Sequence, residues 1–486
     1  MTDQDMKQLI AKVQSSRAEM QSVEVKSAHA GCPTRLYDTL SSFSNQDDGG
    51  VLLFGLDEAR HFLPVGVYDA QDLQKRVAEQ CKEMEPPVRP LFSVMEDGGL
   101  VFVTAEIPAI DISQRPCYYK GKGRLKGSWL RVGDADEPMT EYEIYSYEAY
   151  RRKYQDDLRP VPGLGLSALD KTLLDKYLLD LRSNKPNLAQ MPEQDIISMM
   201  GILRGGELSL WALLLFGPYP QAYFPQLAIV ATVVPGTQMG DVGQQGERFV
   251  DNKRVEGNIA QMLEGALSFV RSNVRVRTVI DAQTGQRSDQ ADYPIGAVRE
   301  VLLNALVHRD YSIHTQGMPI TLNLFSDRLE VQSPGGLYGR IRVDQLGKVQ
   351  PDTRNPVLAT AMEVLRLTEN RYSGIPTIRR EMARAGQPPP VFEDARGSFT
   401  VRLYRHVDRP QLSAQEESIL RFCQTPRSRA ELADHLGIKS VSYAIRSHVR
   451  PLVEAGYLLM ERPEAPGSPY QRYQTAAGIL PAPEQS

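Results

Sequence analysis

Apolar residues recur at helical spacing in some parts of this sequence and form short continuous runs in others. Residues three or four apart share one helix face, so the first pattern predicts helices over 1–18, 32–45, 73–81, 141–154, 255–272 and 294–309. Short apolar or alternating runs bounded by turn residues predict strands over 23–26, 50–56, 100–109, 127–132, 225–235, 320–325 and 328–332. This mixture predicts a multidomain α+β protein.

Three folded parts are expected along the 486 residues, since roughly 150 residues per domain is usual. An α+β domain is predicted over 1–158, before a Pro- and Gly-rich linker. An α/β module follows over 166–407. Residues 411–476 have the order helix, helix, turn, helix, strand, which is typical of a winged helix-turn-helix, and 477–486 are predicted to be a disordered tail.

Composition excludes several classes of protein. The net charge of -4 argues against a uniformly basic coat, so nucleic-acid binding must use local patches. The four cysteines are far apart and form no C-x-x-C pair, which suggests neither a disulfide framework nor a zinc site. The start of the chain is polar, and the longest apolar run, 208–217, is much too short to span a bilayer. We expect a reducing, cytoplasmic protein with no membrane partner.

Carboxylates flank the first two predicted strands. Glu19 and Glu24 lie at the start of the first strand, and Asp57 and Glu58 follow the second. If the strands are neighbours, Glu24 and Asp57 converge and could hold Mg²⁺ or Mn²⁺, with Lys26 holding a phosphate. Such an ion could activate water for phosphodiester cleavage. The alternative is that these acids are solvated or paired with nearby lysines.

A dense basic segment spans 117–133. Its cations are Lys120, Lys122, Arg124, Lys126 and Arg131, interleaved with Tyr118, Tyr119 and Trp129. Basic groups neutralise phosphates and aromatic rings can stack on bases, so this segment predicts contact with nucleic acid. The alternative is a solvated loop whose aromatic rings face the core.

The order of these motifs is specific: E-x4-E-V-K, then LSSFSNQDDGGVLLFGLDE, then LPVG, then RPCYYKGKG and GSWLRVGD. Over residues 15–155 this order resembles the Schlafen AlbA-type domain. The resemblance implies a metal-dependent RNA-cleaving site, with Glu19, Glu24 and Asp57 as its matching acids. Many bacterial relatives with the same acid pattern are described only as DNA-binding or regulatory, so the resemblance implies that role equally. The zinc site and helicase region of animal Schlafens have no counterpart in the sequence.

The helix predicted over 294–309 carries Glu300, Asn304 and His308 on one face. A carboxylate and an amide one turn apart can hold Mg²⁺ and orient a water. The alternative is a polar helix face that is paired within its own domain.

The segments REVLLNALVHRDYS, DRLEVQSPGGL and DTRNPVLATAMEVL resemble the C-terminal module related to RecG-type helicases, a relative of the GHKL ATPases. The resemblance covers about 166–405 and implies that Glu300 serves as general base and Asn304 as Mg²⁺ ligand, with His308 and Gly335 nearby. The D-x-G-x-G adenine loop is replaced by Ser333–Gly336, and the lid segment 370–376 keeps only Gly374. ATP binding is therefore one expectation, and a structural or dimerising role is the other. ATP turnover and helicase activity are not expected.

The last 75 residues predict a positioning helix over 428–438 and a recognition helix over 441–454, kinked or shortened by Pro451. Lys439, Ser442 and Arg446 would then meet the major groove. A winged helix that binds protein instead is the alternative, because acidic residues dilute this basic face.

Two functions fit these patterns. The slightly favoured one is a divalent-metal-dependent endoribonuclease that acts on tRNA-type substrates in stress or phage defence. The other is a DNA-binding transcriptional regulator whose middle module senses a nucleotide or dimerises. An interaction scaffold is a third class. Nucleic acid is the expected partner in both leading hypotheses, and a homodimer is the expected assembly.

Overall fold

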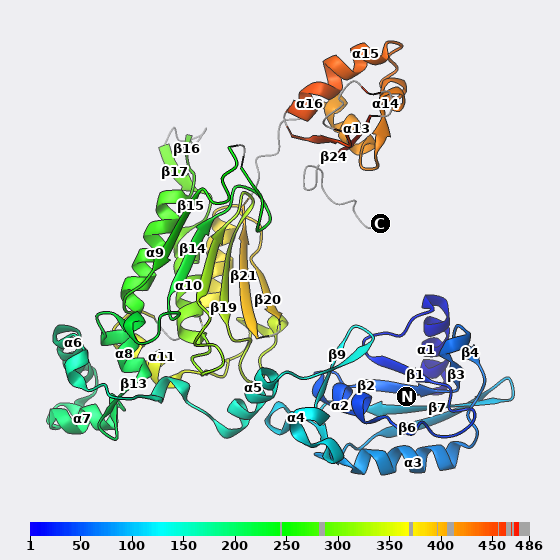
Figure 1. Ribbon diagram of the computed structural model, residues 1–486, viewed down its shortest axis with the longest axis horizontal. Coiled ribbons are helices and arrows are strands. Elements are labelled where there is room, and N and C mark those ends of the chain that lie inside the picture. The colour runs from blue at the N-terminus through cyan, green and yellow to red at the C-terminus, as the bar shows by residue number, and fades with distance from the viewer. Residues whose placement is uncertain are drawn as a thin grey trace. The chain divides into compact units, whose positions relative to one another are not determined.

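The computed structural model describes residues 1–243, 245–280, 287–368, 373–395, 397–405, 413–454, 456–462, 468 and 471–475 (Figure 1). The chain divides into two compact units, Met1–Arg405 and His406–Ser486. The first unit contains two separate sheets, one of four strands and one of six. We call the part around the four-stranded sheet the N-terminal domain and the part around the six-stranded sheet the middle module.

The N-terminal sheet has the order β1-β2-β7-β6. Its strands are β1 (Val23–Lys26), β2 (Gly50–Phe54), β7 (Leu100–Ile107) and β6 (Leu91–Asp97). β1 runs parallel to β2, and the other two pairings are antiparallel. The sequence pattern predicted β1, β2 and β7 but not the edge strand β6, because most of the β6 side chains are at least partly exposed.

Helices cover both faces of this sheet. α2 (Tyr37–Asn45) and α3 (Ala70–Lys82) share one apolar core with Leu52 and Phe54 of β2. α1 (Asp3–Ser16) shares a second core with the intervening Leu53. Because successive strand residues point to opposite faces, a strand packed on both sides needs a continuous apolar run. This explains the sequence GVLLF.

Short elements complete the N-terminal domain. They are β3 (Leu56–Asp57), β4 (Leu63–Pro64), β5 (Met84–Glu85), β8 (Tyr118–Tyr119), α4 (Gly123–Gly127), β9 (Trp129–Val132) and β10 (Ala135–Pro138). The last helix, α5 (Glu141–Arg152), begins at a capping box in which the Thr140 and Glu143 side chains each cap the other's backbone.

The Pro- and Gly-rich segment that was predicted as a linker is anchored. β11 (Pro160–Val161) pairs with β13 (Glu207–Ser209), which also pairs with β12 (Leu203–Arg204). Helices α6 (Lys171–Asn184), α7 (Glu193–Met199) and α8 (Leu210–Phe216) make up most of residues 171–216. All of α8 is buried, which accounts for the longest apolar run of the sequence.

The six-stranded sheet of the middle module has the order β15-β14-β18-β19-β21-β20. Its strands are β14 (Ile229–Val233), β15 (Asp251–Val255), β18 (Ile320–Leu324), β19 (Arg328–Pro334), β20 (Val391–Ala395) and β21 (Ser398–Tyr404). The predicted hairpin between β18 and β19 is confirmed. β16 (Val276–Ile280) and β17 (Arg287–Ala291) form a separate antiparallel pair.

The middle module also contains the helices α9 (Ile259–Asn273), α10 (Ile295–His308), α11 (Pro356–Val364) and α12 (Gly374–Arg384). Of these, α9 and α10 pack on this sheet, α11 contacts α6 and α8, and α12 packs on α10 (Figure 1). α10 contacts α9, α12 and β19, so it lies at the centre of the helical layer. Its apolar face, with Val298, Val301 and Leu302, joins the core of the module.

The C-terminal unit is small and has its own core. Its elements are α13 (Ala414–Phe422), β22 (Arg427–Ser428), α14 (Arg429–His435), α15 (Val441–Ala444), a π-helical turn (Ile445–Val449), α16 (Arg450–Glu454), β23 (Leu458–Met460) and β24 (Arg472–Thr475). The three strands form one sheet in the order β22-β24-β23. The wide π turn precedes Pro451, whose ring cannot fit against the carbonyl four residues earlier in a regular helix. The predicted tail and most of the predicted loop 463–469 lie outside the described residues.

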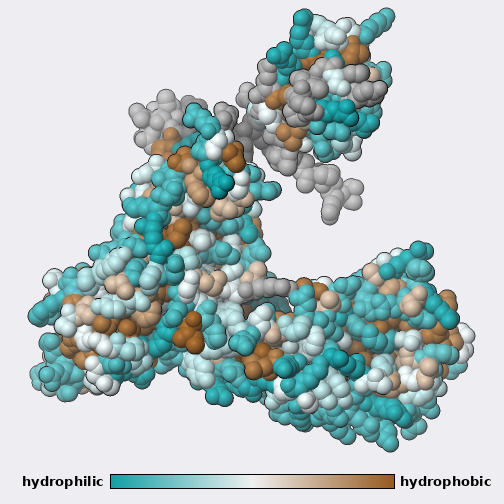
Figure 2. Space-filling view, in the orientation of Figure 1, coloured by the Kyte–Doolittle hydropathy of each residue, from teal (hydrophilic) through white to brown (hydrophobic). Residues whose placement is uncertain are grey.

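These elements confirm the multidomain α+β class. Among the described residues, no helix is long and apolar enough to cross a membrane. The face seen in Figure 2 is mostly hydrophilic, with small dispersed hydrophobic patches. The three-domain boundaries expected from the sequence stay a prediction.

Candidate functional site

Glu19 and Glu24 meet in the N-terminal domain, and an arginine lies between them. Arg131 of β9 contacts Glu24 Oε2 at 2.8 Å and Glu19 Oε2 at 3.4 Å. Its other terminal nitrogen contacts Asp136 Oδ1 at 3.0 Å. The Arg131 side chain is 1% exposed, so this guanidinium is an internal cation shared by three carboxylates. The expectation that Arg131 contacts phosphates is wrong, because its guanidinium is buried and cannot reach a ligand at the surface.

Two further contacts fix the acid pair. The backbone N–H of Val25 donates to Glu19 Oε1 at 2.7 Å, and Lys26 pairs with Glu24. Burial, opposed in part by this hydrogen bond and reinforced by the charge of Glu24, raises the pKa of Glu19 to about 7. Glu19 is therefore partly protonated at neutral pH, which relieves repulsion within the pair.

Asp57 is engaged elsewhere. Its Oδ1 accepts the N–H of Ala59 at 3.1 Å, capping a 3₁₀ turn over Glu58–Arg60, and its Oδ2 lies 3.4 Å from Arg60 Nε. The acid whose charge reaches Glu19 and Lys26 is the neighbouring Glu58. The structure thus brings Glu19, Glu24 and Lys26 together. The Asp57 carboxylate instead caps the 3₁₀ turn that follows it.

The acid cluster does not fit a divalent ion as it is arranged here. A metal site needs several oxygens that face one free position, and the Arg131 guanidinium lies at the position between Glu19 and Glu24. In the part of the chain that the structure describes, no group of three or more His, Cys, Asp or Glu side chains is placed to hold a metal. The predicted Mg²⁺ or Mn²⁺ site stays a prediction that would require Arg131 to move.

The basic segment of the N-terminal domain runs through β8, a 3₁₀ turn (Lys120–Lys122), α4 and β9. Lys120, Lys122 and Lys126 are exposed. Arg124 is partly buried and pairs with Glu148 of α5. Lys120 donates to the Lys82 carbonyl and lies 3.6 Å from Glu85, and Lys122 lies 3.9 Å from Asp38. These are exposed contacts that phosphates could replace, while Arg124 holds the segment against α5.

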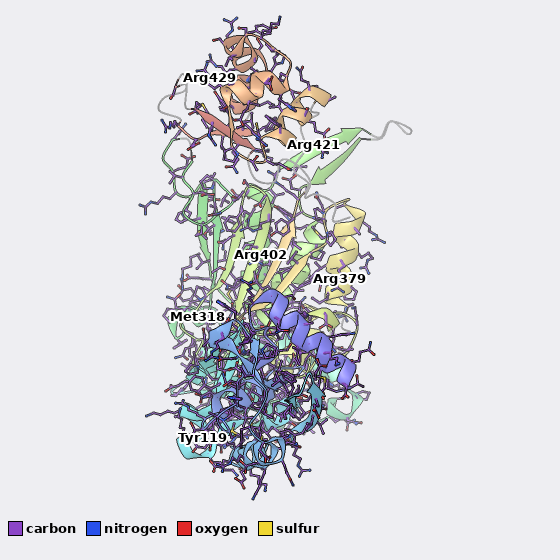
Figure 3. The ribbon with its side chains drawn as sticks, turned by 90° about the vertical axis from the view of Figure 1, so that its right-hand side faces the viewer. Tyr119, Met318, Arg379, Arg402, Arg421 and Arg429 are labelled. Atoms are coloured by element: carbon purple, nitrogen blue, oxygen red, sulfur yellow. The ribbon has the colours of Figure 1, made fainter. Side chains whose placement is uncertain are left out.

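The aromatic residues of this segment are half-buried and pack against neighbouring side chains. The Tyr119 ring, which Figure 3 labels in the N-terminal domain, stacks on Tyr37 with centroids 3.8 Å apart. Arg124 lies over Tyr118, and Lys122 lies over Trp129. This placement supports the alternative in which the rings serve the fold, and it leaves the phosphate contacts to the lysines.

A cleft of about 650 Å³ in the middle module contains the three polar residues of α10. Glu300, Asn304 and His308 all line it, as their spacing predicted. The Asn304 amide nitrogen is buried and has no hydrogen-bond partner among the described residues. The side chain of His308 is exposed to the cleft, yet desolvation by the surrounding walls, followed by the positive charge of Arg354, lowers its pKa, so its ring is neutral at pH 7.

Arginines and a glycine complete the wall of this cleft. Among the described residues that line it, Arg299, Arg366 and Arg380 outnumber the one acid, Glu300, so the cleft suits an anion. Gly374 begins α12, and a Cβ there would lie 3.0 Å from the Asn304 amide nitrogen. A side chain at this position would therefore crowd Asn304 and Glu300, which would have to shift. The predicted lid residues 370–372 lie outside the described residues.

Gly335 marks the apolar end of the cleft. Its φ is +98°, and a Cβ would lie 2.6 Å from Asp310 Cβ, so only glycine fits. It lines a smaller cavity of about 120 Å³, which shares Asn304, His308 and Ile375 with the larger one. Val331, Phe399 and Val401 supply apolar walls. The structure therefore brings all four residues of the expected nucleotide site to one place.

Two features of these sites could not be predicted from the sequence. One is Asp136, which joins the acid cluster and also accepts the hydroxyls of Thr39 and Ser42. The other is the set of cleft arginines, which are scattered over three segments. The alternation of side-chain directions along β9 could have predicted that Arg131 lies on the buried face of the strand. It could not have predicted which acids Arg131 contacts.

In the C-terminal unit, the predicted DNA-contacting residues are exposed. Lys439, Ser442 and Arg446 lie on the turn and helix that follow α14, and Tyr443 beside them is 51% exposed. Ser440 caps this helix through the N–H of Tyr443. This face is free of apolar packing and has a positive character.

Comparison with known families identifies two parts of the first unit. Residues 19–140 match the family described as "Schlafen, AlbA_2", and residues 317–403 match the one described as "Putative ATP-dependent DNA helicase recG C-terminal". The chain carries a Schlafen AlbA_2 domain and a RecG-related module. The resemblances expected from the motifs of both parts are confirmed.

Two solved structures are also similar. The crystal structure of the DIP2311 protein from Corynebacterium diphtheriae is 20% identical, with 93% of each chain covered and a TM-score of 0.39. The solution structure of the N-terminal domain of a "Putative ATP-dependent DNA Helicase RecG-related Protein" from Nitrosomonas europaea is 26% identical, with a TM-score of 0.24. This match covers 29% of the present chain and 95% of the Nitrosomonas europaea chain. The search of curated proteins found no match.

Proposed function

We propose that this protein is a nucleic-acid-binding regulator whose middle module binds a nucleotide. The AlbA_2 domain would contact phosphates through Lys120, Lys122 and Lys126. The C-terminal unit would act as a winged helix that reads DNA through Lys439, Ser442 and Arg446. The family matches support nucleic-acid action in general, and the choice of a regulator is our inference.

One observation carries this choice: the Arg131 guanidinium contacts both Glu19 and Glu24, at 3.4 and 2.8 Å, so these acids already have a partner within the protein. A regulator needs this domain only as a folded surface that binds nucleic acid. The internal Arg131 stabilises such a fold without a bound metal. The exposed lysines and the exposed Lys439 and Arg446 are what such a protein needs for phosphate contacts.

The nucleotide assignment rests on the cleft of the RecG-related module. Its arginines favour a polyphosphate, and the unpartnered Asn304 amide and the apolar end near Gly335 favour a base or sugar beside it. The neutral His308 can accept or donate a hydrogen bond without adding charge. Binding without turnover is the role we assign to this cleft.

Electrophoretic mobility shift with the DNA upstream of the protein's own coding region tests the regulator directly. We expect a discrete shifted band at low salt, lost in the Lys439→Ala, Arg446→Ala double variant. A matched control removes two exposed arginines from α13 and α12, Arg421→Ala and Arg384→Ala. No shift with any DNA, or equal loss in the control, would count against the proposal.

An endoribonuclease is the second candidate, and the meeting of Glu19, Glu24 and Lys26 favours it. Its test is incubation of the purified chain with total tRNA and Mn²⁺ or Mg²⁺, beside Glu24→Gln and an EDTA control. Discrete fragments from the wild type only would replace the regulator by the nuclease. Intact tRNA in every lane, together with a DNA shift, would support the regulator.

A further inference from the structure

Helix α5 touches both the basic segment and the cleft of the middle module. On one side, Glu148 pairs with Arg124 of the basic segment. On the other, the Tyr142 hydroxyl donates to Asp310 Oδ2 at 2.8 Å, and the Tyr150 hydroxyl donates to Asp352 Oδ2 at 3.1 Å. One helix therefore joins two surfaces to which we assign different ligands.

The residues that receive these tyrosines belong to the wall of the cleft. Asp352 lines its apolar end directly. Asp310 pairs with Arg354 at 2.6 Å, and Arg354 both lines the cleft and donates to the Gly336 carbonyl at 3.1 Å. The hydroxyl of Tyr142 and the guanidinium of Arg354 thus share one carboxylate oxygen.

One half of this network, around Asp310, is buried, whereas Asp352 is exposed and a cavity of about 750 Å³ lies beside Tyr142 and Tyr150. The side chains of Asp310 and Arg354 are 0% and 4% exposed. The Tyr142 ring fills the space at Gly397, where a Cβ would lie 2.5 Å from it. The Tyr150 ring packs edge-on against Tyr338, which also lines the cleft, with centroids 5.4 Å apart. A buried pair of charges tolerates displacement poorly, so movement of Arg354 or Tyr338 must be felt by α5.

We propose that α5 couples the ligand cleft of the middle module to the basic segment of the N-terminal domain, with Tyr142 and Tyr150 as positioning residues for the cleft wall. This inference rests on the proposed function, since it assumes a nucleotide in the cleft and nucleic acid on the lysines. A nucleotide that seats against Arg354 and Tyr338 shifts α5, and α5 shifts the segment that holds Lys120, Lys122 and Lys126. The coupling is reciprocal, so nucleic acid changes nucleotide affinity by the same factor.

The test uses the full chain, Mg·ATP as the cleft probe and a fluorescein-labelled single-stranded RNA as the other ligand. The Tyr142→Phe, Tyr150→Phe double variant keeps both rings and removes both hydroxyls. Its matched control is Tyr145→Phe on the same helix, whose hydroxyl bonds Asp156 at 2.8 Å, a residue outside the cleft wall. Calorimetry measures Mg·ATP binding, and fluorescence anisotropy measures RNA binding with and without saturating Mg·ATP.

We expect Mg·ATP to bind the double variant roughly three- to tenfold more weakly than the wild type, the range that loss of one or two hydrogen bonds implies. The control should stay within about twofold. Mg·ATP should change the RNA affinity of the wild type and of the control, and this change should disappear in the double variant. That last effect distinguishes coupling from a general loss of stability.

The outcomes separate the inference from the function on which it rests. If wild type, control and double variant bind Mg·ATP equally, the positioning role is overturned while nucleotide binding stands. If the control weakens as much as the double variant, the effect is structural and the inference fails. If the RNA affinity of the wild type is the same with and without Mg·ATP, the coupling is overturned. A wild type that binds no Mg·ATP, or no nucleic acid, overturns the proposed function itself.

Discussion

The acid cluster of the N-terminal domain and the cleft of the middle module use arginine in opposite ways. In the cluster, one buried arginine lies among three carboxylates, and the charges are satisfied within the protein. In the cleft, three arginines line an open space of about 650 Å³, where Arg299 lies 3.5 Å from Glu300 and Arg380 lies 3.6 Å from Glu381. The buried arrangement stabilises a fold, whereas the partly exposed guanidinium groups of the cleft can attract a ligand. Side chains of the same type therefore point to different roles, which depend on whether they are buried among their partners or face a cavity.

The largest effect should come from removing the internal cation. Arg131→Leu removes the cation that Glu19, Glu24 and Asp136 share and leaves Lys26 as the one basic side chain still paired with an acid of this cluster among the described residues. We therefore expect the free energy of unfolding of the N-terminal domain to fall by about 3 kcal/mol. Urea unfolding followed by circular dichroism measures this. Arg60→Leu is the control, because Arg60 is 70% exposed and pairs only with Asp57, so it should cost less than about 1 kcal/mol. An Arg131→Leu protein as stable as the wild type would remove the contrast between the two sites.

Removing an arginine of the cleft should lower ligand affinity and not stability, the opposite of removing Arg131. Arg380→Ala should weaken Mg·ATP binding about tenfold, which is about 1.4 kcal/mol, with little change in stability. Arg384→Ala lies one turn further along α12, is 71% exposed and does not line the cleft, so its Mg·ATP affinity should match the wild type. Calorimetry and thermal unfolding of both variants provide the two readouts. Loss of stability without loss of affinity would make Arg380 a second internal cation.

The exposed lysines of the basic segment should control the salt dependence of RNA binding. If each contacts one phosphate, the Lys120→Ala, Lys122→Ala, Lys126→Ala variant should reduce the slope of log affinity against log salt by about 2. Anisotropy titrations over a range of salt concentrations measure that slope. The control removes three exposed lysines at α6, Lys171, Lys176 and Lys185, and should leave the slope unchanged. Equal slopes in all three proteins would place the RNA elsewhere.

The smallest effect concerns pH. The pKa of Glu19 is raised from 4.5 to about 7, so the folded protein holds a proton there that the unfolded chain releases. The contribution of Glu19 is therefore fully present below about pH 4.5 and is lost as pH rises through 7. Glu19→Gln should flatten the decrease of the urea midpoint between pH 5 and 8 relative to the wild type. A parallel decrease in both proteins would mean that Glu19 is ionised in the folded state.

Regular elements with strong periodicity were predictable from the sequence, while exposed ones were not. The strand 23–26 and the helix near 294–309 appear as β1 and α10 with nearly the same bounds. β6 and β20 escaped prediction because as edge strands they lack a continuous apolar side. The four residues of the expected nucleotide site meet as predicted, since three share one helix face and Gly335 ends the adjoining strand.

The contacts of the acid cluster could not be predicted from the spacing of residues in the sequence. Strand order indicated that Glu24 and Asp57 would converge, and the resemblance to the Schlafen AlbA-type domain implied that Glu19 joins them. In the structure Glu19 and Glu24 meet. Neither argument could reveal that Arg131, 112 positions after Glu19, would lie between them, or that Asp57 would cap its own turn. Those choices depend on which side chains the packing of β9 and β10 brings to β1.

The sequence by itself determined the local faces of this protein: which strand is buried on both sides, which helix presents Glu300, Asn304 and His308 together, and which segment is basic. Periodicity encodes these faces because neighbouring residues have fixed directions along a helix or strand. The tertiary structure alone decided which charges are paired and which stay open to a ligand. A buried charge needs a partner, and here that partner comes from an element that only folding brings near.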